Sequence, residues 1–249
     1  TSGTTGEPKG VMLTHGNFLA QLEDLKQRIY MFPGERALSV LPVWHAFERL
    51  CEYVMLCQGG AICYSKPIGS VLLADFLKIN PQILPAVPRV FEAVYEGVYR
   101  TMRKTGGVVY ALFRFFVGVA KVHSRIHRHL FRQTARFKND HLLLSWIVLF
   151  IPWLLLYPLK ALGGVIVFKK IRAKLGTSFR GGISGGGALP PQIDEFFWAI
   201  GVNLVEGYGL TETAPVVSVR PFRAPVFGTI GRPLKDVEVR IVDEEGNVL

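Results

Sequence analysis

Short apolar runs alternate with helix-like segments in residues 37–87, which read ALSVLPVWHAFERLCEYVMLCQGGAICYSKPIGSVLLADFLKINPQILPAV. Three runs have the length and composition of buried strands: 37–41, 61–64 and 82–87. Between them, residues 48–58 and 71–78 are apolar at helical spacing, and Gly59-Gly60 ends the first of these helices. This alternation predicts an α/β fold with mostly parallel sheets flanked by helices.

The same alternation extends in both directions from this segment. Thr14 can cap a helix over residues 15–30, and Pro88 can begin one that ends before Gly106-Gly107. Farther along, the pattern predicts a strand at 179–184, a helix at 190–200, a strand at 202–206 and short strands from 216 onward. Alternating apolar residues at 237–241 before an acidic glycine turn predict a hairpin that continues past Leu249. We therefore expect the chain to be a fragment of a longer protein.

The middle of the chain has a different character. Residues 108–138 keep a helical pattern, and one face of that helix is basic: Lys121, Arg125, Arg128, Arg132 and Arg136. The opposite side is apolar: Val119, Val122, Ile126, Leu130 and Phe137. Residues 142–159 follow without a charge and contain Pro152 and Pro158, and residues 169–180 are predicted to be basic and helical again.

The formal net charge of +10 is concentrated in one segment, because residues 100–140 contain ten Lys and Arg but a single acid. A basic segment indicates an anionic partner. Nucleic acid is disfavoured, since aromatic residues do not interleave with the basic ones on one face. We expect peripheral membrane contact through 108–159, with packing of the apolar run on the core and a transmembrane span as alternatives. Three unpaired cysteines favour a cytoplasmic location.

Three glycine-containing motifs carry the chemistry. Residues 1–10, TSGTTGEPKG, can converge backbone amides, hydroxyls and a lysine on phosphate, although a plain flexible loop has the same composition. Residues 184–190, SGGGALP, allow close approach of a flat ligand or form a tight turn. Residues 208–212, YGLTE, offer a ring to stack a base, a hydroxyl for phosphate and a carboxylate for Mg²⁺, or an ordinary turn.

In this order and separation, TSGTTGEPKG, the glycine turn and YGLTET resemble the adenylate-forming superfamily. Three further strings resemble its long-chain fatty acyl branch: LPVWHAFER at 41–49, AVPRVFE at 86–92 and FKKIRAKLG at 168–176. Acyl-CoA synthetases and acyl-acyl-carrier-protein synthetases share these strings. The resemblance covers nearly the whole chain apart from an insertion at about 107–165. It implies an ATP- and acyl-binding α/β region at 1–215 and the start of a β-rich subdomain at 216–249.

The resemblance also implies a role for each motif residue. The β,γ-phosphates of ATP would be held by Ser2, Gly3, Thr4, Thr5, Gly6 and Lys9. The adenine would be flanked by Gly186, Gly187 and Ala188. Tyr208 would stack on it, Thr211 would contact phosphate and Glu212 would bind Mg²⁺. His45 would lie near the carboxylate being activated, unless it is only packed. Lys9, His45, Thr211 and Glu212 are then the expected catalytic residues.

The implied reaction is ATP-dependent activation of a long-chain fatty acid to acyl-AMP, followed by transfer to CoA or acyl carrier protein. The superfamily also uses an aspartate for the ribose, a hinge and a lysine of a C-terminal domain, which we expect beyond Leu249. The fragment alone should therefore bind nucleotide poorly and not complete the reaction. The alternatives are a peripheral membrane-binding module, a fatty-acyl-AMP ligase and a ligase for another carboxylic acid.

Overall fold

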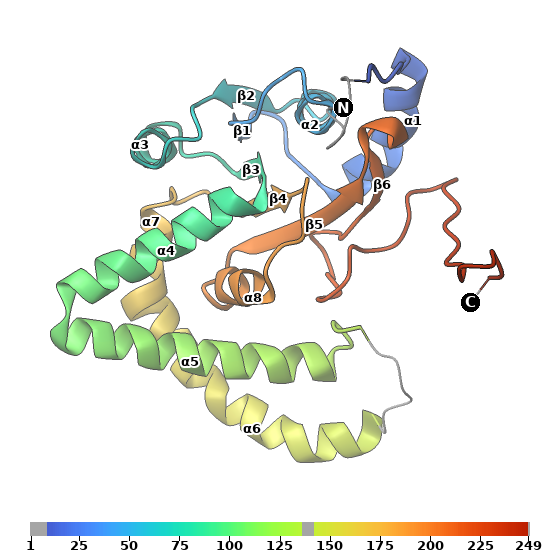
Figure 1. Cartoon of the computed structure of the whole chain (residues 1–249). Coiled ribbons are helices and arrows are strands. Elements are labelled where there is room, and N and C mark those ends of the chain that lie inside the picture. The colour runs from blue at the N-terminus through green and yellow to red at the C-terminus, as the bar shows by residue number, and fades with distance from the viewer. Residues whose placement is uncertain (1–8, 136–141, 249) are drawn as a thin grey trace.

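The computed structural model describes residues 9–135 and 142–248. Its centre is a six-stranded sheet in the order β2-β1-β3-β4-β5-β6 (Figure 1). The strands are β1 (Arg36–Ser39), β2 (Ala61–Tyr64), β3 (Ile83–Ala86), β4 (Gly181–Ser184), β5 (Asn203–Gly209) and β6 (Val216–Val219). The first five are parallel to their neighbours, and β6 runs antiparallel to β5. The predicted α/β fold with a mostly parallel sheet is confirmed.

Helices connect the strands and cover both faces of the sheet. They are α1 (His15–Arg28), α2 (Ala46–Leu56), α3 (Gly69–Ile79), α4 (Pro88–Thr105), α5 (Gly107–Leu130), α6 (Leu142–Gly163), α7 (Lys169–Ala173) and α8 (Pro191–Ala199). A π-helical segment, η1 (Gly164–Phe168), joins α6 to α7, and a 3₁₀ turn, η2 (Thr211–Thr213), follows β5. The predicted helix at 88–105 and strand at 61–64 have the predicted bounds.

Each strand sends successive side chains to opposite faces of the sheet. Ala37 and Ile83 pack with α1 and α2, while Leu38 and Leu84 pack with α3, α4 and α8. This follows from the two-residue period of a strand. The sheet therefore separates two apolar cores, and each core has its own set of helices.

Three cations on the basic side of α5 have partners within the protein. Lys121 Nζ lies 3.6 Å from Glu195 Oε2 on α8, and Arg125 pairs with the same carboxylate. Arg128 is buried, with its guanidinium carbon 3.5 Å from the centre of the Phe227 ring. An acid on α8 and the ring of Phe227 thus provide these cations with partners inside the fold. The expected membrane contact through 108–159 stays a prediction.

The structure also changes the bounds of several predicted elements. The helix predicted at 108–138 ends at Leu130, and Arg132 has a φ of +55°; Arg136 and Phe137 lie outside the described residues. The helix predicted at 169–180 ends at Ala173, and Gly176, with φ +85°, then turns the chain toward β4. Pro152 and Pro158 lie inside α6 rather than ending it.

The segment after β6 has little regular structure. Isolated bridges join Ser218 to Pro233 and Val242 to Val248, and the strand predicted at 237–241 does not form within the described chain. An extended segment needs a neighbouring strand to pair its backbone groups. The assignment of 216–249 to a β-rich subdomain stays a prediction.

Candidate active site

A cavity of about 260 Å³ lies where β4 and β5 end, between the sheet and helices α1 and α2. Five residues singled out from the sequence line it: His45, Gly186, Tyr208, Thr211 and Glu212. They come from three segments that lie far apart in the chain. The carboxyl ends of parallel strands are where α/β folds usually bind ligands, which fits this position.

Strand β5 contains Tyr208 near its end and leads directly into the turn that carries Thr211 and Glu212. Tyr208 pairs with Ser218 of β6, and the register shifts between Tyr208 and Gly209. A Cβ on Gly209 would stand 1.7 Å from the carbonyl oxygen of Pro215, so only glycine fits there. This close approach brings the YGLTE segment over the cavity.

Gln21 of α1 holds this segment in place, a role that the motif reading missed. Its amide nitrogen donates to the carbonyl oxygens of Thr213 (2.7 Å) and Val216 (3.0 Å), and its Oε1 accepts from Val216 N (3.2 Å). Gln21 is buried in the part of α1 that faces the sheet. Three hydrogen bonds from one side chain therefore fix the backbone on both sides of the cis Ala214–Pro215 bond.

The glycine turn after β4 approaches both α2 and β5. Gly185 N donates to Ala86 O at 3.2 Å, and a Cβ on Gly185 would stand 2.9 Å from the ring of Phe47. Gly186 has a φ of +77°, which favours glycine. Glu206 Oε1 accepts from Leu189 N at 2.8 Å and ties the end of the turn to β5.

Gly187 and Ala188 are exposed in the same turn but do not line the cavity. The space beside Gly187 is bordered by Pro88, 3.7 Å from a hypothetical Cβ. The structure thus brings Gly186 to the cavity and leaves its two neighbours at the surface. Their assignment to the adenine stays a prediction.

His45 caps the first turn of α2. Its Nδ1 accepts a hydrogen bond from Phe47 N at 3.2 Å, while the ring is exposed at the cavity. The cap favours the tautomer with the proton on Nε2, which leaves that nitrogen as a donor toward a ligand. The two interpretations of His45, packed residue and ligand contact, are therefore compatible.

Ser2, Gly3, Thr4, Thr5 and Gly6 lie outside the described residues. Lys9 begins the described chain, is exposed and is not among the residues that line the cavity. The structure therefore does not test the assignment of this loop to phosphate binding.

The interior of the cavity is apolar, and its lining residues were not identified from the sequence. They include Leu25 of α1, Ile29 directly after it, and four residues of α2: Phe47, Leu50, Cys51 and Val54. The signal in the sequence is the apolar face of α2, which begins directly after His45. One cavity thus joins a polar mouth to an apolar interior, which suits a ligand with a polar reacting end and an apolar chain.

Glu48 is fully buried on α2, and neither carboxylate oxygen has a hydrogen-bond partner among the described residues. Burial, with a smaller contribution from Glu52, raises the pKa of Glu48 to about 7. Burial likewise raises the pKa of the Cys51 thiol. This side of α2 is thus a dry environment that disfavours negative charge.

Glu212 is compatible with a magnesium ion bound together with a nucleotide. Its carboxylate is exposed at the mouth of the cavity and forms no hydrogen bond or ion pair in the described chain. No cluster of three or more His, Cys, Asp or Glu side chains suited to a metal occurs in 9–135 or 142–248. Mg²⁺ is commonly bound by one or two carboxylates plus substrate phosphates, and Glu212 can supply one such ligand.

Comparison with known proteins shows the relationship. Probable acyl-activating enzyme 16, chloroplastic, of Arabidopsis thaliana is 41% identical over all of this chain and 35% of its own length. The long-chain-fatty-acid–[acyl-carrier-protein] ligase AEE15, chloroplastic, of the same plant is 38% identical over 99% of this chain and 34% of its length. The chain thus spans about a third of these curated relatives.

The fold has solved counterparts as well. o-Succinylbenzoate CoA synthetase from Bacillus subtilis, solved in complex with ATP and magnesium ion, matches all of this chain and 37% of its own with a TM-score of 0.59 and 19% identity. The family described as AMP-binding enzyme matches residues 1–249. The chain therefore belongs to the family of AMP-binding enzymes.

Proposed function

We propose that the parent protein activates a long-chain fatty acid with ATP to give acyl-AMP and then transfers the acyl group to a thiol of CoA or acyl carrier protein. The observation that carries this proposal is the cavity that joins a polar mouth beside Tyr208, Thr211 and Glu212 to an apolar interior. The two Arabidopsis relatives, one named as a long-chain-fatty-acid–acyl-carrier-protein ligase, support the choice of substrate.

The reaction requires two anions to approach each other. A carboxylate oxygen attacks the α-phosphorus and pyrophosphate leaves; the thiolate then attacks the acyl carbon and AMP leaves. Mg²⁺ bound with the help of Glu212 would neutralise phosphate charge. Tyr208 offers a ring to the adenine, Thr211 a hydroxyl to phosphate, and Lys9 a cation to the departing pyrophosphate. His45 donates from Nε2 to the carboxylate.

The apolar interior selects the acid. An alkyl chain that enters between α1, α2 and β4 contacts Leu25, Leu50 and Val54, which offer no polar partner. A short or charged acid loses this burial, which is worth ~0.8 kcal/mol per CH₂ group. We therefore propose a preference for long, unbranched carboxylic acids.

Pyrophosphate exchange with the full-length parent tests the proposal. Exchange of labelled pyrophosphate into ATP should depend on a fatty acid, rise with chain length and need no thiol. Release of AMP should require CoA or holo-acyl carrier protein, assayed in parallel to identify the acceptor. Exchange that is supported equally well by acetate and by palmitate would contradict the assignment.

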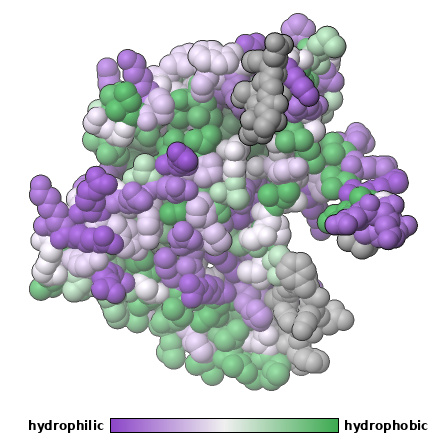
Figure 2. All heavy atoms as spheres, in the orientation of Figure 1, coloured by the Kyte–Doolittle hydropathy of each residue, from purple (hydrophilic) through white to green (hydrophobic). Residues whose placement is uncertain are grey.

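We also propose that α6 contacts a membrane through its exposed apolar face. Two helical stretches, Gly107–Leu130 and Leu144–Ala173, are long and apolar enough to cross a membrane, a test that core helices also pass. Gly107–Leu130 is held to α8 by ion pairs. In contrast, only 6% of the most apolar 18-residue stretch of Leu144–Ala173 is buried. Figure 2 shows the hydrophobic residues gathered along the lower edge, where Figure 1 places α6.

This contact requires no span. The exposed residues include Ile147, Ile151, Leu154 and Leu155, which occupy one side of α6, while Trp153 turns toward α5. A helix with one buried and one apolar exposed side suits an interfacial position. Co-sedimentation of the parent with phosphatidylcholine vesicles tests it; no binding to any vesicle would contradict the proposal.

A further inference from the structure

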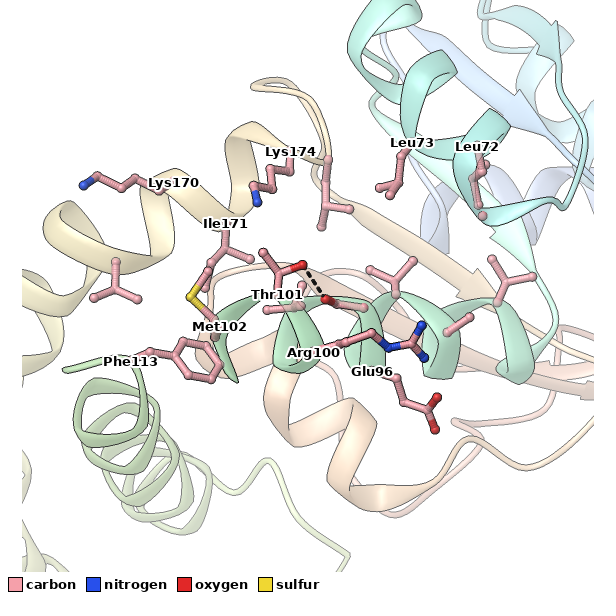
Figure 3. Close-up of a pocket in the computed structure, with 18 of the residues that line it drawn as sticks. Leu72, Leu73, Glu96, Arg100, Thr101, Met102, Phe113, Lys170, Ile171 and Lys174 are labelled. Atoms are coloured by element: carbon pink, nitrogen blue, oxygen red, sulfur yellow. Dashed lines mark hydrogen bonds between the residues drawn. The ribbon is translucent and has the colours of Figure 1, made fainter. Parts of the chain in front are cut away.

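A second and larger cavity lies on the opposite side of the sheet from the candidate active site. It has a volume of about 900 Å³ and lies between α3, α4, the beginning of α5 and the η1–α7 segment (Figure 3). Its wall residues Leu72, Phe113 and Ile171 belong to the core on the α3–α4 side, whereas Leu25 and Leu50 of the first cavity belong to the other core. The sheet therefore separates the two cavities, and we refer to the larger one as the α4–α7 groove.

The wall of the α4–α7 groove is predominantly apolar. Its floor and sides include Leu72, Val94, Met102, Phe113, Ile171 and Leu175. Binding sites for small molecules commonly occupy ~300–1,000 Å³ and are lined mainly by such side chains. The groove has the size and lining of a site for one apolar chain.

Positive charge surrounds the opening of the groove. Arg89, Arg100, Lys170 and Lys174 line it and are exposed, and Glu96 is the one acid that lines it. None of the four cations forms an ion pair within residues 9–135 and 142–248, unlike Lys121 and Arg125 on α5. In Figure 3, Lys174 turns its ammonium group toward Thr101 on the facing helix, and Arg100 projects from that helix. An apolar trough with unpaired cations at its edge is complementary to an amphiphile with an anionic head.

The groove is continuous with the exposed apolar surface of the α5–α6 region. Val109, Leu112 and Ile166 line the groove and are also exposed large apolar residues of α5 and η1. These residues thus form a continuous apolar path along which an alkyl chain can pass from a lipid surface into the groove. A nucleotide or an inorganic anion would leave most of the apolar groove wall without an apolar contact.

We infer that the α4–α7 groove is a second binding site for one long-chain fatty acid, with the alkyl chain along α4 and the carboxylate at Lys174 and Arg100. The choice of a fatty acid rests on the proposed function; the amphiphilic character of the ligand rests on the groove alone. The site is separate from the adenylation cavity because the sheet lies between them.

Gly97 offers a direct way to fill the groove. It lines the groove on α4, and no atom lies within 4 Å of a Cβ placed on it, so Gly97→Phe adds a ring without a clash at its base. Gly118 on α5 is equally open but does not line the groove, which makes Gly118→Phe the matched control. The charge variant is Arg100→Gln with Lys174→Gln, and its control is Arg103→Gln with Lys104→Gln, which neutralises two cations of α4 outside the groove.

The experiment is photolabelling of the full-length parent with a palmitate analogue that has a diazirine in its chain, with labelled peptides mapped by mass spectrometry. A non-hydrolysable acyl-AMP analogue occupies the adenylation site throughout. We expect labels on peptides containing Val98, Met102 or Ile171, reduced at least about tenfold in Gly97→Phe and in the charge variant but not in either control. Fatty-acid-dependent pyrophosphate exchange, measured without the analogue, should be retained in Gly97→Phe.

Each contrary result has a distinct meaning. Active parent without groove labels overturns the inference and leaves the proposed function intact. Labelling by a diazirine phosphatidylglycerol in vesicles but not by the palmitate probe also overturns it, because the ligand is then a membrane lipid. Loss of exchange in Gly97→Phe, with Gly118→Phe active, overturns the separation of the two sites. Groove labels in a parent that lacks exchange support the inference and contradict the proposed function.

Discussion

Glu212 carries the most specific chemical expectation of any single residue. Its carboxylate lies at the mouth of the cavity, beside Tyr208 and Thr211, without a hydrogen-bond partner in the described chain. A carboxylate without a partner in the protein adds little to the stability of the fold. Its removal should therefore affect the reaction far more than the fold.

Glu212→Gln in the parent should lower fatty-acid-dependent pyrophosphate exchange by ~10²-fold or more, about 3 kcal/mol of transition-state stabilisation. Gln keeps the shape of the side chain but loses the charge that a divalent cation needs. Glu244→Gln, which changes an exposed acid far along the chain, is the control. Near-normal exchange at saturating Mg²⁺ would remove Glu212 from the site.

Glu48 shows how burial alone can make stability depend on pH. Its pKa is raised from about 4.5 to about 7, so the folded protein keeps the proton after the unfolded chain has lost it. The stability attached to this group is therefore present below pH 4.5, falls as the pH rises to about 7 and then levels off.

Glu48→Gln should remove the loss of folding stability that Glu48 causes as the pH rises. The variant should gain melting temperature relative to wild type between pH 5 and pH 8, with an upper limit of ~3 kcal/mol in unfolding free energy. Thermal melts of the parent at closely spaced pH values measure it. A difference between variant and wild type that is constant over this range would show that Glu48 does not titrate there.

At the level of elements, α1 holds the segment that carries Thr211 and Glu212. Gln21 binds the carbonyl groups of Thr213 and Val216 and thereby fixes η2 against the sheet. The elements are adjacent only because β6 lies at the edge of the sheet next to α1. We therefore expect Gln21 to act as a positioning residue rather than a catalytic one.

Gln21→Leu should lower kcat for pyrophosphate exchange by about tenfold and change the KM for fatty acid little, because η2 loses its hydrogen bonds while the apolar cavity remains. Gln21→Glu keeps the acceptor to Val216 N and should recover part of the loss. Equal changes in kcat and in melting temperature for both variants would indicate a purely structural role.

The contact between α5 and α6 combines aromatic stacking with buried histidines. His123 stacks on Trp153 at 5.6 Å and has no hydrogen-bond partner among the described residues, and His127 lies 6.1 Å from the same ring. Burial first, then Lys160 and His127, lower the pKa of His123 to about 4. Burial, Lys160 and Arg128 lower that of His127.

Because the pKa of His123 is lower in the folded state than its ordinary value of 6.5, this group favours folding fully above pH 6.5. That contribution is lost as the pH falls toward 4. We therefore expect α6 to loosen from α5 between pH 6.5 and 4. Hydrogen exchange of α6 amides in the parent should accelerate over this range in wild type and less in His123→Phe, which keeps the stacking. Equal acceleration in both would assign the effect to other groups.

At the scale of the whole molecule, the candidate active site lies on one side of the sheet, the α1–α2 side, and the α4–α7 groove and the exposed helix α6 lie on the other side (Figure 1). We refer to α5 and α6 together as the arm. Lys121 pairs with Glu195 at 3.6 Å and Arg128 lies over Phe227, which connects the arm to α8 and to the segment after β6. The arm is therefore anchored to the fold by its basic side and presents its apolar side outward.

Ile151→Asn with Leu155→Asn should reduce vesicle binding of the parent by at least about tenfold, since two apolar side chains leave the lipid interface. Val239→Asn with Ile241→Asn, at exposed apolar positions outside α6, is the matched control. Binding should depend weakly on salt, because Lys121 and Arg125 pair with Glu195 and Arg128 is buried. Strong loss of binding in high salt would restore the electrostatic interpretation.

Residue patterns were sufficient for the strands of the central sheet and for most helices, but not for 237–241, where the expected strand does not form in the described chain. These elements follow from local signals: the two-residue period of the strands, the proline at the start of α4 and the glycine after it. Such signals depend only on residues that are close together in the sequence. The motif strings likewise indicated that Tyr208, Thr211 and Glu212 act together, because they lie within five residues of one another.

Tertiary structure decided what depends on neighbours distant in sequence. The contacts of the basic side of α5 could not be predicted without Glu195 and Phe227, which lie 70 or more residues away. The apolar interior of the cavity, the three hydrogen bonds of Gln21 and the α4–α7 groove each require surfaces from several elements. Periodicity reports which side of a helix is polar, but only packing determines what that side meets.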